Sequence, residues 1–148
     1  MPTRSARTTW TGGLKGGSGR VALVSSGAGT YEVSFPRRTA DEAGGTTSPE
    51  ELIAAAHTAC FAMQFAGLLG AAGGSGQSLD IGGDVTLSPD QSGGFRISGV
   101  RLTVRGSAQG VTPEEFARIA QEAKSSCPVS KALAGTDILL EVAAADAG

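Results

Sequence analysis

Two cysteines, Cys60 and Cys127, are the residues of this chain with the clearest chemical potential, and their settings differ. Cys60 lies inside a long alanine-rich apolar stretch, whereas Cys127 directly precedes Pro128 at the end of a helical pattern. They are far apart in the chain, so only the fold can bring them together. Such a pair can be a disulfide, two inert core thiols, or a reactive cysteine with a resolving partner. The surrounding residues favour the third possibility.

A reactive thiolate needs positive charge or hydrogen-bond donors nearby at neutral pH, and an apolar helix by itself raises the pKa of Cys60. Arg37 and Arg38 precede the helix and could fold back towards it, although solvated loop charges are the alternative. Glu50 has no local hydrogen-bonding role and lies about three helical turns before Cys60. We therefore expect Glu50 to bind and orient an arginine through a bidentate ion pair.

His57 lies one helical turn before Cys60. It could be a base or a hydrogen-bond partner, or equally a satisfied core histidine. With Cys60 and Cys127 it would supply only three metal ligands, whereas structural zinc sites use four. No fourth ligand is evident, so we expect no metal site.

Length and composition indicate one domain over residues 1–148, with 40% hydrophobic residues and a net charge of −2. The sequence has no basic stripe that would indicate nucleic-acid binding, and we expect no signal peptide because the amino terminus lacks the apolar segment of one. Between Leu52 and Leu79 there is no Asp, Glu, Lys or Arg, but the alanine and glycine content and the polar residues His57, Thr58 and Gln64 favour a buried helix over a membrane span. We expect a cytoplasmic protein, where thiols stay reduced unless they are catalytic or sensing.

The first half of the chain predicts three short strands, a loop and a long helix. The helix should begin at Pro49 and run to about Leu69, because Ser48 can cap it and Glu51 completes a capping box. Being apolar on all sides, it must be covered on most of them, and its small residues would allow close packing across a subunit boundary. The strands are expected at Arg7–Thr11, Arg20–Ser25 and Thr30–Phe35, and the loop at Pro36–Thr47.

The second half predicts a hairpin, a second capped helix, a short helical piece and a last strand. Thr112, Pro113 and Glu115 mark the start of the second helix, and Pro128 stops it. The strands are expected at Leu79–Leu87, Phe95–Gly106 and Ile138–Val142, and the short helical piece at Val129–Ala134. Gly99 is expected to mark a bulge, and the glycine pairs, Gly82-Gly83 included, are expected in turns or bulges. The order βββ-α-ββ-α-β indicates an α+β fold with long helices packed on antiparallel sheets.

Two motifs resemble those of the OsmC/Ohr family of bacterial peroxide-defence proteins. They are Ser48-Pro49-Glu50-Glu51-Leu52-Ile53-Ala54-Ala55-Ala56-His57-Thr58-Ala59-Cys60-Phe61 and Cys127-Pro128-Val129-Ser130. His57 and Val129 resemble the residues of the OsmC branch at these two positions, since the Ohr branch usually has tyrosine at both. The resemblance implies an OsmC-like fold, an intertwined homodimer with active sites across the subunit interface, and thiol peroxidase activity on hydroperoxides.

The resemblance also implies roles for individual residues. Cys60 would be the peroxidatic cysteine, Cys127 the resolving cysteine, Arg38 the active-site arginine and Glu50 its carboxylate partner, with Arg37 as the alternative arginine. An external dithiol, such as a lipoyl-bearing protein, would reduce the resulting disulfide, and no flavin, haem or metal is required. An apolar pocket that favours organic over hydrogen peroxide is expected from Leu52, Phe61, Met63 and Phe65.

Two other functions remain compatible with the residues. One is a redox-sensing or small-molecule-binding module that keeps the pocket but turns over poorly. The other is a structural domain with a buried disulfide, which the expected cytoplasmic setting disfavours.

Overall fold

The computed structural model describes residues 1–145 and divides the chain into two compact units, Met1–Leu52 and Ile53–Gly148. The α+β class is confirmed. The prediction that residues 1–148 form a single domain stays a prediction, because two compact units can belong to one domain.

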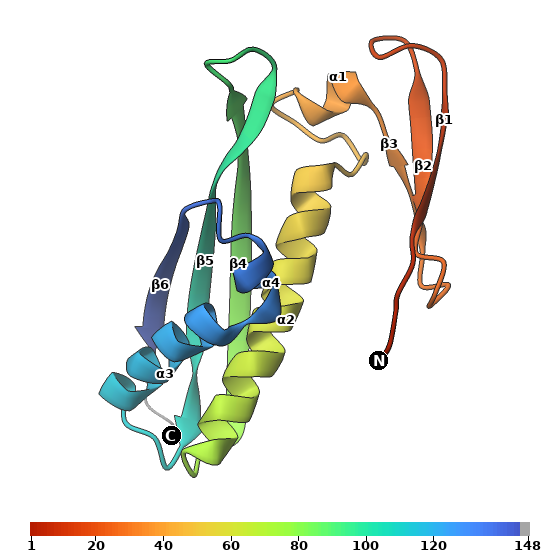
Figure 1. Ribbon diagram of the computed structural model, residues 1–148. Helices are drawn as coiled ribbons and strands as arrows, with labels where there is room; N and C mark the ends of the chain where they lie inside the picture. The colour runs from red at the N-terminus through yellow and green to blue at the C-terminus, as the bar shows by residue number, and fades with distance from the viewer. Residues whose placement is uncertain (146–148) are drawn as a thin grey trace. The chain divides into compact units, whose positions relative to one another are not determined.

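The first unit contains an antiparallel three-stranded sheet (Figure 1). Its strands follow one another in the order of the sequence: β1 (Arg7–Thr11), β2 (Ser18–Ala22) and β3 (Thr30–Val33). The predicted third strand is too long, because β3 ends at Val33 and a short helix, α1 (Phe35–Arg38), begins inside the stretch assigned to strand and loop. The Ser34 hydroxyl caps α1 by accepting the N–H of Arg37, and Pro36 suits its first turn.

The long helix α2 (Pro49–Ala71) begins at the predicted residue and runs slightly further than predicted. Ser48 caps it by accepting the N–H of Glu51 at 3.1 Å. The capping box is only half formed, because the Glu51 carboxylate accepts the Thr47 hydroxyl proton instead of the N–H of Ser48. Beyond its end, Gly73 adopts a left-handed φ of 86°, which a side chain would resist.

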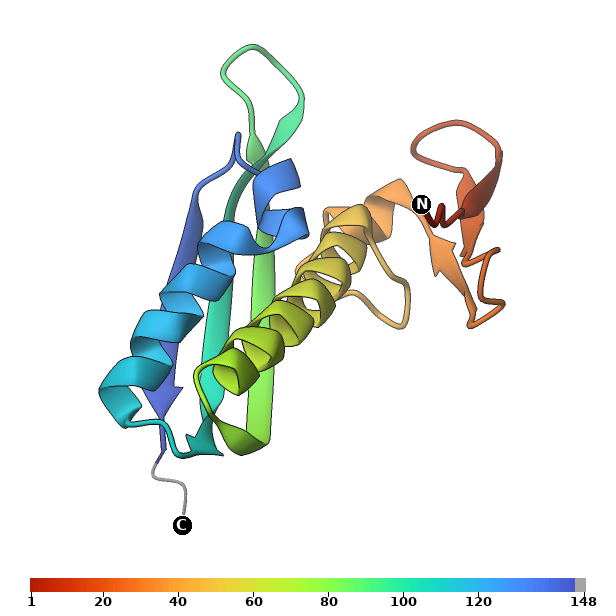
Figure 2. The same cartoon turned by 60° about the horizontal axis from the view of Figure 1, so that its bottom comes forward.

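The second unit places helices on one face of a three-stranded sheet (Figures 1 and 2). The sheet consists of β4 (Ser75–Pro89), β5 (Phe95–Gln109) and β6 (Ile138–Ala144). The helices that follow β5 are α3 (Pro113–Ser126) and α4 (Pro128–Ala132). With α1 and α4 counted, the order is βββ-α-α-ββ-α-α-β.

The expectation of purely antiparallel sheets is wrong for the last strand, because β6 pairs parallel with β5. The chain crosses through α3 and α4 before it returns to the sheet, and a crossover of that length allows parallel pairing. The predicted hairpin of β4 and β5 is confirmed and is antiparallel. Its register shifts where Thr86 pairs with Gly99 and Leu87 with Ile97, so the bulge falls next to the glycine predicted to mark it.

One face of α2 forms the centre of the core of the second unit. Phe61, Phe65 and Leu69 recur at four-residue spacing on the helix and are fully buried. They belong to one cluster with apolar residues of β5 and α3, and the ring of Phe65 meets that of Phe116 edge to face at 4.8 Å. This packing, rather than helix propensity, holds α2 on the sheet.

Another face of α2 is uncovered within the chain. Ala59, Met63 and Gly67 are exposed there, and Met63 retains 75% of its surface. By length and composition α2 could cross a membrane, but its opposite face packs into the core. Within a single chain, one face of α2 is covered and this face is not, so the expectation that most sides of the helix are covered stays a prediction about the assembled protein.

Close approach of α2 to the sheet depends on a glycine in β4. We expected Gly82-Gly83 in a turn or bulge, but both residues lie within the strand. A Cβ at Gly83 would lie 2.8 Å from Cγ2 of Thr58 on α2. The glycine therefore leaves room for the helix that carries Cys60.

Candidate active site

The fold brings the two cysteines together. Their sulfur atoms are 3.2 Å apart, within hydrogen-bond distance. Both thiols are free, since a disulfide would need a sulfur–sulfur distance of about 2.05 Å. Cys127 is fully buried, whereas Cys60 is partly exposed. A solvent-borne oxidant therefore reaches Cys60 more easily than Cys127.

Cys127 lies at the junction of α3 and α4. Its backbone N–H donates to the carbonyl of Ala123, and its carbonyl accepts the N–H of Lys131 at 3.0 Å. Pro128 begins α4, and Cys127 is extended with φ −60° and ψ 125°, as expected for a residue before proline. The same residue thus ends one helix and caps the next, which fixes its sulfur beside α2.

The two thiols have opposite pKa perturbations. Burial raises the pKa of Cys60, although the backbone N–H of Val129 counteracts it. Burial also opposes ionisation of Cys127, but hydrogen bonds from the Ser130 backbone, Cys60 and the Ser130 hydroxyl outweigh it and lower its pKa. Within the second unit the described groups therefore favour charge on Cys127. A thiolate on Cys60 needs a positive charge from a residue outside that set.

His57 is a core histidine with one hydrogen-bond partner. Its Nε2 lies 2.7 Å from Oγ of Ser130, and both residues are buried. Burial lowers the pKa of His57, so its ring is neutral near pH 7. Ser130 was not among the predicted site residues, although its position in the Cys127-Pro128-Val129-Ser130 motif could have indicated that it lies near Cys127.

The predicted arginine–glutamate pair is present in the first unit. Nε of Arg38 donates to both carboxylate oxygens of Glu50 at 3.2 Å, and its Nη2 donates to Oε1 at 2.7 Å. Burial would raise the pKa of Glu50, but the hydrogen bonds from Arg38 reverse this and lower it. Arg37 is exposed and does not form this pair. The choice between the two arginines as the partner of Glu50 is therefore settled in favour of Arg38.

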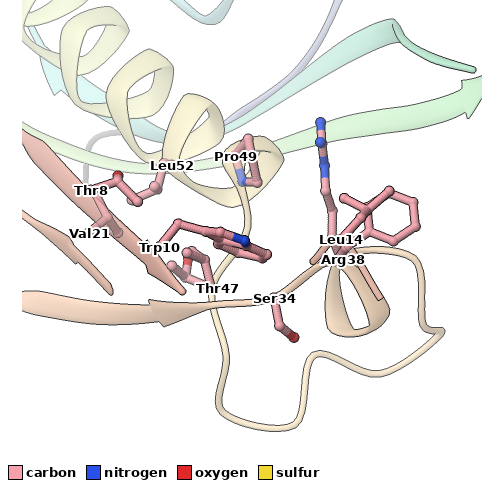
Figure 3. A pocket seen from close by; sticks show the side chains of 11 residues that line it. Thr8, Trp10, Leu14, Val21, Ser34, Arg38, Thr47, Pro49 and Leu52 are labelled. Carbon is pink, nitrogen blue, oxygen red and sulfur yellow. The ribbon is translucent and has the colours of Figure 1, made fainter. Parts of the chain in front are cut away.

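A cavity of about 380 Å³ lies within the first unit, beside Arg38 (Figure 3). Apolar side chains form most of its wall, and Figure 3 shows Trp10, Val21 and Leu52 among them. Sequence reasoning missed the contributions of β1 and of the β1–β2 turn, which supply Trp10 and Leu14. The cavity combines an apolar wall with one guanidinium, which suits an apolar ligand that carries a polar end.

The predicted pocket residues separate into three settings. Leu52 lines the cavity of the first unit, as expected. Phe61 and Phe65 are fully buried in the core of the second unit, and Met63 is exposed. The two phenylalanines therefore serve packing in this structure. Among residues 1–145, no group of three or more His, Cys, Asp or Glu side chains is arranged to hold a metal ion.

A family model described as OsmC-like protein matches residues 41–142. The chain is also 37% identical to peroxiredoxin OsmC of Escherichia coli, over 88% of this chain and 89% of that protein. The chain belongs to the OsmC-like protein family. The resemblance to the OsmC/Ohr family, and to its OsmC branch, is thereby confirmed.

Other relatives extend the similarity to the Ohr side of the OsmC-like family. The organic hydroperoxide resistance protein OhrA of Bacillus subtilis is 36% identical over 66% of this chain and 67% of its own. The crystal structure of OhrB from the same species is 26% identical, with a TM-score of 0.69 over 94% of this chain and 98% of that chain. An organic hydroperoxide resistance protein OsmC from Legionella pneumophila shares the fold, with a TM-score of 0.73 at 24% identity over 97% of this chain and 98% of that chain.

Proposed function

We propose that this chain is a cysteine-based peroxidase that reduces organic hydroperoxides to alcohols at the expense of a dithiol. The observation that carries the proposal is the pair of free thiols 3.2 Å apart, one partly exposed and one fully buried. The relatives named peroxiredoxin and organic hydroperoxide resistance protein support the same reaction class.

Cys60 is the attacking residue, because a peroxide can reach its sulfur from solvent. Its thiolate attacks one oxygen of ROOH, the O–O bond breaks, and the alkoxide takes up a proton to become the alcohol. Cys60 is left as a sulfenic acid, which Cys127 converts to a disulfide. An external dithiol, for which a lipoyl-bearing protein is our candidate, then restores both thiols.

Arg38 is the cation we assign to the chemical step, on the strength of the family resemblance. Burial opposes ionisation of Cys60, so a guanidinium is needed both to stabilise the thiolate and to receive the developing alkoxide charge. Glu50 holds Arg38 in one orientation through both of its carboxylate oxygens. Glu50 is therefore a positioning residue for that arginine.

The preference for organic peroxides is supported by the cavity beside Arg38. Its walls of Trp10, Val21 and Leu52 can accept an alkyl or aryl group, which hydrogen peroxide lacks. A wholly polar peroxide leaves this apolar surface in contact with water and gains nothing from it.

A homodimer is the assembly we propose. The exposed apolar face of α2, which includes Ala59, Met63 and Gly67, offers small side chains that permit close helix packing. Its burial against a second copy would complete the covering of this helix. We place the enzyme in the cytoplasm, where reducing dithiols are available.

The decisive experiment traps the sulfenic acid. Cys127→Ser protein is treated with one equivalent of cumene hydroperoxide and then with dimedone, and the labelled residue is located by mass spectrometry. We expect one label per chain, on Cys60. A folded protein that consumes no peroxide and carries no label on Cys60 would exclude the proposed reaction.

A matched pair of arginine variants tests the assignment of the cation. Arg38→Ala should slow peroxide consumption by about a hundredfold or more, whereas Arg37→Ala removes the same charge from the next residue and should not. Equal effects would remove Arg38 from the mechanism. A wild-type protein that oxidises once and then stalls with every dithiol offered would be a redox sensor instead.

A further inference from the structure

A buried hydrogen bond links the two segments that carry the cysteines. His57 lies three residues before Cys60 on α2, and Ser130 lies three residues after Cys127 on α4. Nε2 of His57 and Oγ of Ser130 are 2.7 Å apart; His57 is fully buried and Ser130 retains 6% of its surface. A polar pair placed this deep in the core must match its donors and acceptors.

Ser130 also acts on the ionisation of Cys127, the residue that caps α4 three positions before it. Hydrogen bonding from its backbone N–H and its hydroxyl favours the thiolate and lowers the pKa of Cys127. The hydroxyl therefore stands between His57 on one side and Cys127 on the other. No other polar side chain among the described residues contacts both a cysteine and His57.

The direction of this chain of hydrogen bonds follows from the proton count. A serine hydroxyl carries one proton, so if it donates to Cys127 it must accept from His57. His57 then has its proton on Nε2, and Nδ1 is a bare acceptor. Nδ1 is indeed buried without a partner among the described residues, and a buried acceptor without a partner is less anomalous than a buried donor. Burial lowers the pKa of His57, which keeps the ring in this neutral form.

We propose that His57 is a positioning residue for the resolving step: its Nε2–H holds the Ser130 hydroxyl with the proton directed at Cys127, and so stabilises the thiolate that attacks oxidised Cys60. The inference rests on the proposed peroxidase function. It deepens that function by assigning the second chemical step to groups other than the arginine.

The step balances as follows. The Cys127 thiolate donates an electron pair to the sulfur of the Cys60 sulfenic acid, the S–S bond forms and the S–O bond breaks. Hydroxide leaves and combines with the proton that Cys127 released, giving water. The sulfenic sulfur is reduced and the thiolate sulfur is oxidised, so no further oxidant or reductant takes part.

The groups around Cys127 limit what else could set its ionisation. Cys60 and His57, both on α2, are the titratable side chains that face the site, the latter through Ser130. Lys124 and Lys131 are the basic residues in the last turns of α3 and α4, and neither is among the groups that shift the pKa of Cys127. Apart from Cys60, Ser130 is thus the residue whose side chain shifts the pKa of Cys127, so its substitution should change that pKa.

The test separates the two chemical steps in the full-length protein. Wild type, Ser130→Ala, His57→Gln and His57→Leu are mixed with one equivalent of cumene hydroperoxide between about pH 5 and pH 10. Sulfenic acid formation is followed by peroxide consumption, and resolution by the loss of dimedone-reactive protein. Ser125→Ala is the matched control, because it removes an exposed hydroxyl from the end of α3 that bonds only its own helix.

Ser130→Ala and His57→Leu should slow resolution about tenfold at neutral pH and move its pH midpoint upward by about one unit. His57→Gln should retain fast resolution and the wild-type midpoint, since its amide can still donate to Ser130. Ser125→Ala should match wild type in both steps.

Three results would overturn the inference while leaving the peroxidase function in place. Resolution in Ser130→Ala could keep the wild-type rate and midpoint, His57→Gln could be as slow as His57→Leu, or Ser125→Ala could be as slow as Ser130→Ala. Absence of sulfenic acid in every protein, wild type included, would instead refute the peroxidase function. If His57→Leu does not fold, the comparison of Ser130→Ala with His57→Gln still decides.

Discussion

The ion pair between Arg38 and Glu50 makes a quantitative prediction for Glu50→Gln. This substitution keeps the size of the side chain and one acceptor oxygen but removes the negative charge. The Glu50 side chain retains 9% of its surface and Arg38 retains 32%, so the pair is neither buried nor exposed. Breaking a buried pair costs about 3–5 kcal/mol, and an exposed pair is worth about 0.2–1 kcal/mol.

Solvent screening at the partly exposed arginine places the expected loss between those limits, at about 2 kcal/mol. For a chain of this length that loss lowers the melting temperature by about 4–8 °C. The pH dependence follows from the lowered pKa of Glu50 in the folded protein. A carboxylate with a lowered pKa stabilises the fold above its unfolded pKa, and this contribution disappears as the pH falls through the folded value.

Thermal unfolding followed by circular dichroism at a series of pH values measures the difference directly. Wild type should exceed Glu50→Gln by the full amount near neutral pH; the difference should begin to shrink near about pH 4 and vanish only below the lowered pKa of Glu50. Glu42→Gln is the control, because it removes the same charge from an exposed residue of the same unit and should cost no more than about 0.5 kcal/mol. A difference that persists at acid pH, or equal losses in the two variants, would refute the argument.

Three further predictions concern packing and assembly. Gly83→Ala should destabilise the fold by about 1–3 kcal/mol, because the new methyl meets Thr58 at 2.8 Å, and Thr58→Ser should recover part of that loss in urea denaturation of the double variant. Phe65→Ala should cost about 3–5 kcal/mol by the same measurement, since it removes a fully buried ring packed on Phe116, and a loss below 1 kcal/mol would contradict the core assignment. Met63→Lys should leave the monomer fold intact and shift the sedimentation coefficient from dimer to monomer; an unchanged dimer would place the interface elsewhere.

The features that sequence predicted well are those set by short-range chemistry. Thr112 and Glu115 form the expected capping box, and Pro128 holds Cys127 extended at the expected helix break. The pairing of Glu50 with an arginine followed from the absence of any other local role for its carboxylate. Each of these depends on neighbours within a few residues or on the geometry of a single element.

The features that sequence missed depend on which surfaces meet. Every face of α2 is apolar, so periodicity did not show that Phe61 and Phe65 belong to the core while Met63 stays exposed. The direction of β6 was open for a similar reason, because alternation of buried and exposed residues is the same in parallel and antiparallel strands. Ser130 could be assigned to the site only when the fold placed it against His57.

The parallel pairing of β6 with β5 affects how long Cys60 is without its partner cysteine while the chain is being synthesised. Cys127 follows Cys60 by 67 residues, and the crossover that carries it closes only when β6 joins the sheet. At about 5–20 residues per second, a ribosome needs about 3–13 seconds to cover that interval. Throughout it, a nascent chain displays its first cysteine without the second. A sulfenic acid formed on Cys60 during that interval has no resolving thiol and can proceed to the irreversible sulfinic acid.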